Sequence, residues 1–461
     1  MCIRDSILSA EETADRFTLP INEGSDVDTL RAEMSHQVLP LGQWPMFDVR
    51  LTRVNQQDWH LHLSIDALIL DGESAAFLLN EIFTRYHGTS PDSTDELDGV
   101  SFRDYVLRLN EDADRGAART WWEERIATLP PAPALPLACD PDRLEDTRFT
   151  RHSDRLNSEN WAALQNRATA AGLTPSAVLL SAYAETLAGW TRSAAFSLNI
   201  TVGDRRREFG PAVANMLGVF TGLVPLGLTN ARSGSFIKRA RAVQDGLAEA
   251  LDHRAFSGVE VQRLIAQRAG QAGAGLLPVV FTSLLGEAGF EPVEHGATPV
   301  HAITQTPQTW LDLKVYESAA LNSDKNDELT IDWDAPTALF PSGLVATMAD
   351  AFIGLLHRLA EDESAWLETG RSLLPASQAA LTDRLNATTT ALPTHLLHTS
   401  VLKAMSAWPD RPALIEGETS LSFAELELRT RAAARQLNST CLLYTSPSPR
   451  DRQKSRMPSS A

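Results

Sequence analysis

The sequence predicts an α+β fold built around a mixed β-sheet. Segments with apolar residues at every second position, typical of strands, occur along the same chain as segments with helical spacing near 3.6. The two kinds follow one another without the regular strand–helix alternation of a parallel α/β protein. Hydrophobic residues make up 43% and charged residues 22% of the 461 positions, as in an ordinary globular chain of roughly two or three domains.

Both ends of the chain are expected to come from a sequencing adaptor. Residues 441–451 can be encoded by the transposase end and adaptor used to build sequencing libraries, and residues 456–461 continue it in the same frame. Residues 1–5 fit the reverse complement of the same transposase end. Residues 1–6 and 441–461 are therefore left out of the fold prediction, and the chain is expected to be a fragment.

Charge and cysteine content limit the possible partners. The chain has 41 basic and 59 acidic residues, a net charge of −18, which argues against a nucleic-acid partner. It lacks an apolar run of about 18 residues, so no membrane span is predicted. Two of the three cysteines lie in the adaptor-derived ends, which leaves Cys139 without a disulfide or thiolate-metal partner. We expect a cytoplasmic protein without a metal.

The clearest strand covers residues 59–65, where Trp59, Leu61 and further apolar residues alternate with polar ones. It is expected to be half-buried and to form a hairpin with residues 46–54 across residues 55–58.

A helix is predicted to follow directly, with an apolar face formed by Phe77, Leu78, Ile82 and Phe83 and an end near Gly88. Asp66, Asp71 and Ser74 therefore gather where the strand ends and the helix begins. Each of them has a simple structural alternative, because Asp71 or Ser74 would serve as an N-cap and Asp66 as a turn residue.

The remaining elements are predicted from the same patterns. Helices are expected at 102–113, at 115–128, from Asn157 or Ser158, from Thr174-Pro175, at 234–252 and at 341–360. Strands are expected at 196–202, 219–228, 278–285, 310–316 and 329–333. Prolines make residues 130–136 an extended connector. Residues 376–397 are small and polar and predict a linker, after which a helix at 397–408 opens a second domain.

The ordered motifs resemble a nonribosomal peptide synthetase heterocyclization domain followed by the start of an adenylation domain. Asp66 to Ser74 matches an Asp-x4-Asp-x2-Ser signature that replaces the histidine motif of ordinary condensation domains. The other matching blocks are residues 30–40 with 44–48, 122–125 with 129–137, 174–180, 278–283 and 305–312, and, for the adenylation start, 409–415 and 421–426. The resemblance implies a heterocyclization domain over 7–375, a linker over 376–397 and a truncated adenylation domain over 398–440.

The resemblance also implies a fold and partners. Two chloramphenicol-acetyltransferase-like lobes would form a V around a tunnel, with the N-terminal part of the first lobe missing. Upstream and downstream peptidyl carrier domains would deliver aminoacyl and peptidyl thioesters on phosphopantetheine arms, and the domain itself would bind no cofactor directly. The reaction would join an acyl group to carrier-bound Cys, Ser or Thr and then lose water to form a thiazoline or oxazoline.

Two residues are expected to carry the cyclodehydration. By resemblance, Asp312 is the general acid/base and Thr282 its hydrogen-bonding partner. A carboxylate suits this role best when burial raises its pKa. The alternatives are a surface carboxylate between Leu311 and Leu313 and an ordinary strand hydroxyl.

Further roles follow from the same resemblance. Asp71 is expected to be structural, in an ion pair with an arginine that the sequence does not identify. Asp66 would lie at the tunnel and orient the substrate. Gln305 belongs to the last motif, and Asn199 would line the tunnel, with a turn or strand-edge amide as its alternative.

The chain departs from the family pattern at two places. It has Val219-Phe-Thr-Gly222 where Asp-Phe-Thr-Ser is usual, and Leu313 where histidine is common after the aspartate. These changes fit a divergent subfamily or weaker cyclisation. Two rivals therefore stay open, namely an amide-forming condensation domain without cyclisation and a catalytically silent carrier-docking domain. The adenylation start lacks nucleotide-binding motifs, so ATP binding is not expected. The chain as printed is expected to be unstable or inactive.

Overall fold

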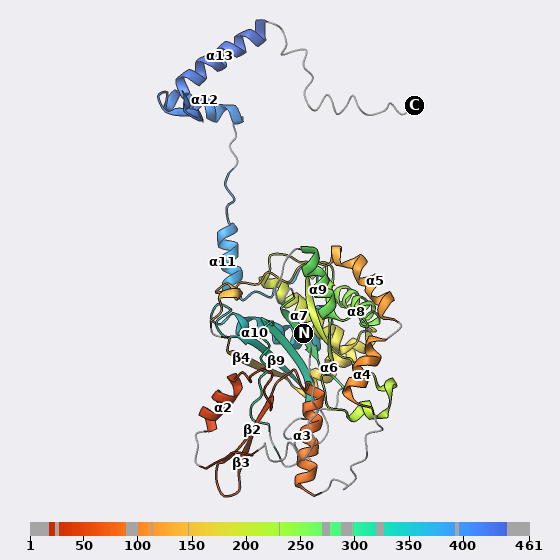
Figure 1. Ribbon diagram of the computed structural model, residues 1–461. Coiled ribbons are helices and arrows are strands. Elements are labelled where there is room, and N and C mark those ends of the chain that lie inside the picture. Colours follow the sequence, from red (N-terminus) through yellow and green to blue (C-terminus); the bar gives the residue numbers. More distant parts are fainter. Residues whose placement is uncertain are drawn as a thin grey trace, which may run out of the picture. The chain divides into compact units, whose positions relative to one another are not determined.

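The computed structural model describes residues 18–23, 27–88, 100–111, 114–145, 147–229, 231–269, 277–286, 297, 299–319, 327–391 and 396–439. The chain divides into two units, Met1–Ala379 and Ala380–Ala461 (Figure 1). The ends predicted to derive from an adaptor, residues 1–6 and 441–461, lie outside the described residues.

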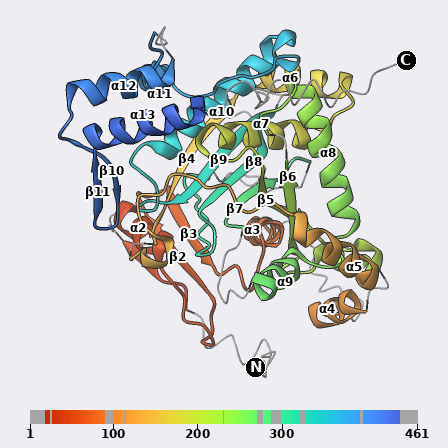
Figure 2. The same ribbon diagram turned by 90° about the horizontal axis from the view of Figure 1, so that it is seen from above.

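A mixed six-stranded sheet organises the first unit (Figure 2). Its strands, in spatial order, are β4 (Phe149–Leu156), β9 (Asp327–Pro336), β8 (Leu311–Ala319), β7 (Val279–Ser283), β5 (Phe196–Gly203) and β6 (Thr221–Leu228). β7 is parallel to both β5 and β8, and the other neighbours are antiparallel. The predicted α+β class with a mixed sheet is confirmed.

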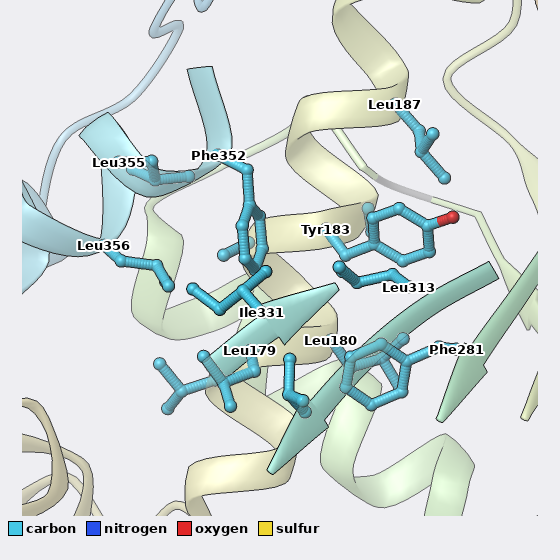
Figure 3. Packing of buried hydrophobic residues seen from close by; sticks show 14 of the residues in the cluster. Leu179, Leu180, Tyr183, Leu187, Phe281, Leu313, Ile331, Phe352, Leu355 and Leu356 are labelled. Atoms are coloured by element: carbon cyan, nitrogen blue, oxygen red, sulfur yellow. The ribbon is translucent and has the colours of Figure 1, made fainter. Parts of the chain in front are cut away.

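Helices pack on one face of this sheet and form the main core. α7 (Pro175–Trp190) is buried along most of its length, and α6 (Ser158–Ala170), α8 (Phe236–Asp252) and α10 (Leu344–Glu361) surround it. Leu313 and Ile331 from the strands lie against Tyr183 and Phe352 from the helices (Figure 3). Fully burying a side chain of this size stabilises the fold by about 1.5–3 kcal/mol.

The opposite face of the sheet is polar. On β8 the side chains of Asp312 and Lys314 alternate with the fully buried Leu311, Leu313 and Val315. α9 (Gly258–Ala269) lies against β6, which is the edge strand next to β5. Their contact is close, because a Cβ atom on Gly258 would lie 2.3 Å from the carbonyl oxygen of Leu223.

A smaller sheet contains β1 (Ile21–Glu23), β2 (Phe47–Arg53) and β3 (Trp59–Ile65). The helix α2 (Val27–His36) connects β1 to β2, and α3 (Gly72–Tyr86) follows β3. The predicted hairpin is confirmed, and Gly88 takes a left-handed φ of +67° after α3. Burial of the first half of β3 was predicted wrongly. Trp59 and Leu61 are 43% and 36% exposed because they lie toward the hairpin turn, which projects beyond α2 (Figure 1).

Several other elements differ from the prediction. The structure adds β1, β4, α2 and α9, whereas α4 (Phe102–Asn110), α5 (Arg115–Arg125) and the caps Asn157 and Thr174 agree with it. β4 was missed because its sequence is mostly polar, without an apolar alternation to detect. α10 begins at Leu344 rather than Pro341, since Gly343 has a left-handed φ of +78° just before it.

The predicted linker at 376–397 begins with a helix, α11 (Ala376–Asn386), whose alanine and leucine residues favour helix. Residues 387–391 have no regular structure. The second unit then has α12 (Leu397–Ala407), β10 (Pro412–Glu416), β11 (Thr419–Ser422) and α13 (Phe423–Ser439), which agrees with the predicted helix followed by a strand–helix pattern. Among the helices that the structure describes, none has the length and apolar character needed to cross a bilayer.

Candidate active site

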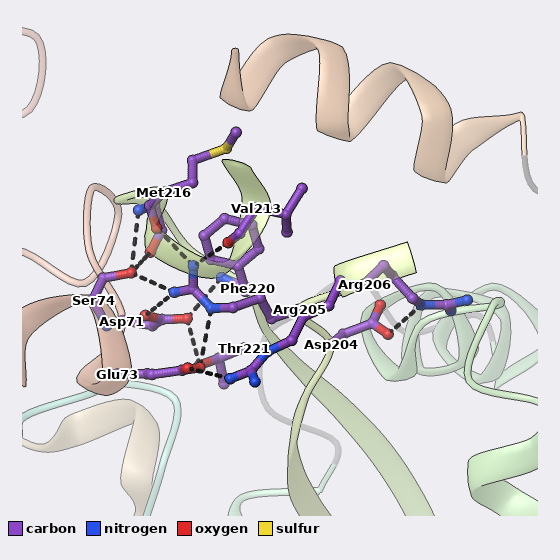
Figure 4. A network of polar contacts seen from close by, with 12 residues as sticks. Asp71, Glu73, Ser74, Asp204, Arg205, Arg206, Val213, Met216, Phe220 and Thr221 are labelled. Carbon is purple, nitrogen blue, oxygen red and sulfur yellow. Dashed lines mark hydrogen bonds and ion pairs between the residues drawn. The ribbon is translucent and has the colours of Figure 1, made fainter. Parts of the chain in front are cut away.

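Asp71 joins the start of α3 to the segment before β6 (Figure 4). Its Oδ1 accepts a hydrogen bond of 2.9 Å from the Ser74 backbone N–H, which makes Asp71 the N-cap of α3. Its Oδ2 accepts one of 2.8 Å from the backbone N–H of Phe220 and one of 3.4 Å from the Thr221 hydroxyl. Both carboxylate oxygens of Asp71 are therefore engaged within the protein.

Ser74 reinforces this junction from the same helix turn. Its buried hydroxyl donates to the Gly218 carbonyl at 2.9 Å and accepts from the Gly218 N–H at 3.2 Å. Gly218 has no room for a side chain, because a Cβ atom there would lie 2.5 Å from the Phe102 ring. The close approach of the Phe102 ring to the backbone thus explains why a glycine precedes Val219.

Arg205 is the arginine that the sequence did not identify. Its guanidinium lies 3.9 Å from Asp71 Oδ1 and 3.1 Å from Glu73 Oε2, and its side chain is only 5% exposed. It also donates to the carbonyls of Val213, at 2.9 Å, and Met216, at 2.7 Å (Figure 4). The ion pair expected for Asp71 is thus present, and Arg205 ties α3 to the segment after β5.

Asp66 makes local contacts. Its Oδ1 accepts from the Leu68 backbone N–H at 2.9 Å, and its own N–H donates to the Met46 carbonyl at 3.0 Å. This is the hydrogen-bonding pattern of an aspartate in a turn. The contacts therefore favour the structural alternative for Asp66.

Thr282 and Asp312 lie on neighbouring parallel strands, β7 and β8, and both face the polar side of the sheet. The Thr282 hydroxyl is 3.1 Å from Asp312 Oδ1 and 3.0 Å from the Thr201 hydroxyl on β5. Thr282 is 8% exposed, and the Asp312 side chain is 15% exposed. The hydrogen bond predicted between these two residues is present, and Asp312 is too enclosed to be a simple surface carboxylate.

A row of charged side chains continues from Asp312 across the sheet. The Lys314 Nζ lies 3.2 Å from Asp312 Oδ2 and 2.6 Å from Asp334 Oδ2. Arg151 on β4 then contacts Asp334 at 2.7 Å and Asp332 at 2.8 Å. Sequence reasoning missed this row, because it joins three separate stretches of the chain, at Arg151, at 312–314 and at 332–334, that only the strand pairing brings together.

Burial and the neighbouring charges shift the pKa values of Asp334 and Tyr316. Burial by itself would raise the pKa of Asp334, but the hydrogen bond from Arg151 and the charge of Lys314 hold it below its ordinary value of 3.8. Burial, together with Asp332, raises the pKa of Tyr316 to about 12. Tyr316 therefore stays protonated and donates to Asp332 Oδ2 at 3.0 Å.

Asn199 and Gln305 are both engaged with backbone groups. Asn199 is 4% exposed, and its Nδ2 donates to the Leu277 carbonyl at 2.7 Å. Gln305 accepts from the Phe149 backbone N–H at 3.4 Å and contacts His36 Nδ1 at 3.0 Å. Gln305 thereby connects the end of α2 with the start of β4. For Asn199 these contacts favour a structural role, but on the internal strand β5 rather than at a turn or a strand edge.

Leu313, which stands where histidine is common in the family, lies away from the Thr282–Asp312 pair. Leu313 is fully buried in the core on the face of β8 opposite to Asp312.

A hollow of about 240 Å³ lies away from Thr282 and Asp312. It is lined by Glu73, Phe77, Asn80, Arg205, Arg207, Ala214, Asn215 and Met216. Neither Thr282 nor Asp312 lines it, so we place the candidate reaction centre by the hydrogen-bonded pair rather than by this hollow.

A family model described as the condensation domain matches residues 11–382. The chain belongs to the condensation domain family. This condensation domain is 38% identical over 347 residues to pyochelin synthetase PchF of Pseudomonas aeruginosa, which covers 74% of the chain and 18% of PchF. It is 32% identical over 423 residues to phenyloxazoline synthase MbtB of Mycobacterium tuberculosis, which covers 90% of the chain and 28% of MbtB.

The fold of the condensation domain agrees with solved structures. The cyclization-docking bidomain of the nonribosomal peptide synthetase EpoB from Sorangium cellulosum matches it with a TM-score of 0.66 and 33% identity, over 76% of this chain and 71% of the other. The predicted chloramphenicol-acetyltransferase-like class is thereby confirmed. The chain spans only about a fifth of the length of PchF and less than a third of MbtB.

The Arg205 contacts predict a large effect on stability. Arg205→Met would leave the buried Asp71 without its cation and the carbonyls of Val213 and Met216 without a donor. We expect the free energy of unfolding, measured in urea, to fall by about 3–5 kcal/mol. Arg207→Met is the matched control, because the Arg207 side chain is 70% exposed and should contribute less than about 1 kcal/mol. Equal effects of the two changes would contradict this prediction.

The low pKa of Asp334 predicts how stability changes with pH. Because the pKa is depressed in the folded state, ionised Asp334 stabilises the fold above the ordinary value of 3.8, and this contribution is lost as the pH falls through the lower folded value. Asp334→Asn should therefore lower the free energy of unfolding by about 3–5 kcal/mol at neutral pH. The deficit relative to the unmodified protein should shrink below about pH 4.

Urea unfolding curves at several pH values test this expectation. Asp245→Asn, at an exposed position on α8, is the control and should change the free energy of unfolding by less than about 0.5 kcal/mol. An Asp334→Asn deficit of the same size in acid and at neutral pH would show that Asp334 does not contribute through its charge.

Proposed function

We propose that this condensation domain is a heterocyclization domain of a nonribosomal peptide synthetase. It would condense a carrier-bound acyl or peptidyl thioester with carrier-bound Cys, Ser or Thr, and then cyclodehydrate the product to a thiazoline or oxazoline. The observation that carries the proposal is the hydrogen-bonded pair of Thr282 and Asp312 on the polar face of the sheet.

The relatives support the cyclising activity by their names. MbtB is a phenyloxazoline synthase, and an oxazoline contains the five-membered ring that cyclodehydration of a serine or threonine amide would produce. EpoB contributes a cyclization domain of the same fold at 33% identity. PchF and PchE are pyochelin synthetases.

The proposed reaction has two stages. In the first, the amino nitrogen of the carrier-bound acceptor attacks the donor thioester, a C–N bond forms, the C–S bond breaks and the donor carrier's thiol is released. In the second, the acceptor's side-chain sulfur or oxygen attacks the new amide carbonyl. The former carbonyl oxygen then leaves as water, the ring nitrogen loses its proton and a C=N bond forms.

Asp312 can move the protons that the second stage requires. A carboxylate placed at the reacting amide can donate a proton to the departing oxygen and accept the proton lost by the nitrogen. The Thr282 hydroxyl, at 3.1 Å from Oδ1, would fix the orientation of this carboxylate. Asp71 and Arg205 would contribute to the reaction indirectly, by holding α3 on the segments that follow β5 and precede β6.

The partners are part of the proposal. Upstream and downstream peptidyl carrier domains would present their thioesters on phosphopantetheine arms, so the reactive thiols would come from the partners. Residues 376–397 would connect the condensation domain to an adenylation domain that starts at about residue 398. In support, the alignment to PchE covers 92% of the chain, whereas the condensation family match ends at residue 382.

The main alternative is condensation without cyclisation. The absence of a double-histidine motif at 66–71 argues against it, as does the formed Thr282–Asp312 pair. A silent carrier-docking domain is the second alternative, suggested by Val219 and Gly222 in place of the usual residues. It predicts that changing Asp312 alters no product.

Replacement of Asp312 distinguishes these possibilities. In a synthetase module with loaded carriers, Asp312→Asn should lower the cyclisation rate by about 10²–10⁴-fold and leave the linear amide, because an asparagine side chain cannot act as a general acid or base. Thr282→Val, which removes the hydroxyl and keeps the shape, should also favour the linear product. Mass spectrometry of the released product measures both forms, since cyclisation removes one further water.

Asp350→Asn provides the control, because Asp350 is exposed on α10 and should not affect the product. A linear amide as the sole product of the unmodified module would exclude cyclisation. Unchanged cyclisation by the Asp312→Asn variant would remove Asp312 from the mechanism.

A further inference from the structure

We propose that Lys314 is a positioning residue for Asp312, held in place by Asp334, a carboxylate that Arg151 pairs from β4. This inference rests on the proposed cyclising function. Lys314 would fix the second oxygen of the Asp312 carboxylate, as Thr282 fixes the first, and would thereby serve cyclodehydration more than amide formation.

The position of Lys314 on the strand is unusual for a lysine. It lies two residues after Asp312 on β8, so both side chains leave the same face of the sheet. Its side chain is 13% exposed, although a lysine normally extends its ammonium group into water. Two carboxylates replace the lost water, with Nζ at 3.2 Å from Asp312 and 2.6 Å from Asp334.

Strand pairing creates the need for this cation. Asp312 on β8 is directly opposite Asp334 on β9, and like charges facing each other across a strand pair are destabilising. Lys314 contacts both carboxylates, and Arg151 pairs with Asp334 from the β4 side. Without Lys314, repulsion by Asp334 would turn the Asp312 carboxylate away from its present orientation.

Two anchors on different strands define the plane of the Asp312 carboxylate. Oδ1 receives the Thr282 hydroxyl from β7 at 3.1 Å, and Oδ2 receives the Lys314 ammonium at 3.2 Å. A carboxylate held at one oxygen can still rotate, whereas one held at both presents its remaining lone pairs in fixed directions. Displacement of a reacting group by about 1 Å can cost about 100-fold in rate.

The test compares Lys314→Met and Lys314→Arg in a synthetase module with loaded carriers. The rates of linear amide formation and of subsequent water loss are followed separately by mass spectrometry. Lys314→Met should slow water loss by about 10- to 100-fold and amide formation by less than about 2-fold, so that linear amide accumulates. Lys314→Arg, which keeps the charge, should recover part of the loss.

Two further variants keep the test decisive. Lys314→Gln retains hydrogen-bond donors without the charge and replaces Lys314→Met if that variant does not fold. Ser153→Ala is the matched control, because the Ser153 hydroxyl contacts Asp332 at the far end of the row and leaves the Lys314–Asp312 pair intact. This control should keep the unmodified ratio of linear to cyclised product.

Four results would overturn the inference. If the Lys314 variants keep the unmodified product ratio, Lys314 does not position Asp312. If they slow both stages equally, or if Lys314→Arg is as impaired as Lys314→Met, the residue only supports the fold. If the unmodified module forms no ring at all, the proposed function itself fails, which is recognised without any variant.

Discussion

The two-residue alternation of side chains along β8 and β9 is the constraint on which the core and the candidate active site both depend. Leu313, Ile331 and Trp333 point into the helical layer, whereas Asp312 and Asp334 point to the opposite face. A shift of one residue in register would exchange these faces and bury the carboxylates in the core. Packing of the apolar residues on α7 and α10 therefore also fixes where the carboxylates lie.

Charge pairing makes this polar face compatible with burial. Asp332 and Asp334 are 2% and 0% exposed, and isolated carboxylates at such sites would cost several kcal/mol. Arg151 and Lys314, from the strands on either side, provide the compensating charges. At the start of α3, Arg205 does the same for Asp71. Each carboxylate thus fixes the position of a cation that arrives from a distant part of the sequence.

The sequence was most informative where patterns are local. Periodicity and capping residues predict the hairpin of β2 and β3, the caps Asn157 and Thr174, and the apolar strands β5 to β9. The sequence predicted the Thr282–Asp312 hydrogen bond through family resemblance, because nothing in spacing alone places residues 30 apart on adjoining strands. β4, α9, Arg205 and Lys314 were not predicted, since their roles arise from contacts across strands and between elements.

The most direct measurement isolates the second stage of the proposed reaction. The linear amide, prepared on the downstream carrier, is given to the unmodified domain and to the Asp312→Asn variant, and its mass is followed over time. The account predicts that the unmodified domain converts it to a product lighter by one water, while the variant leaves it unchanged. Equal conversion by both proteins, or none by either, would contradict the assignment of cyclodehydration to this face of the sheet.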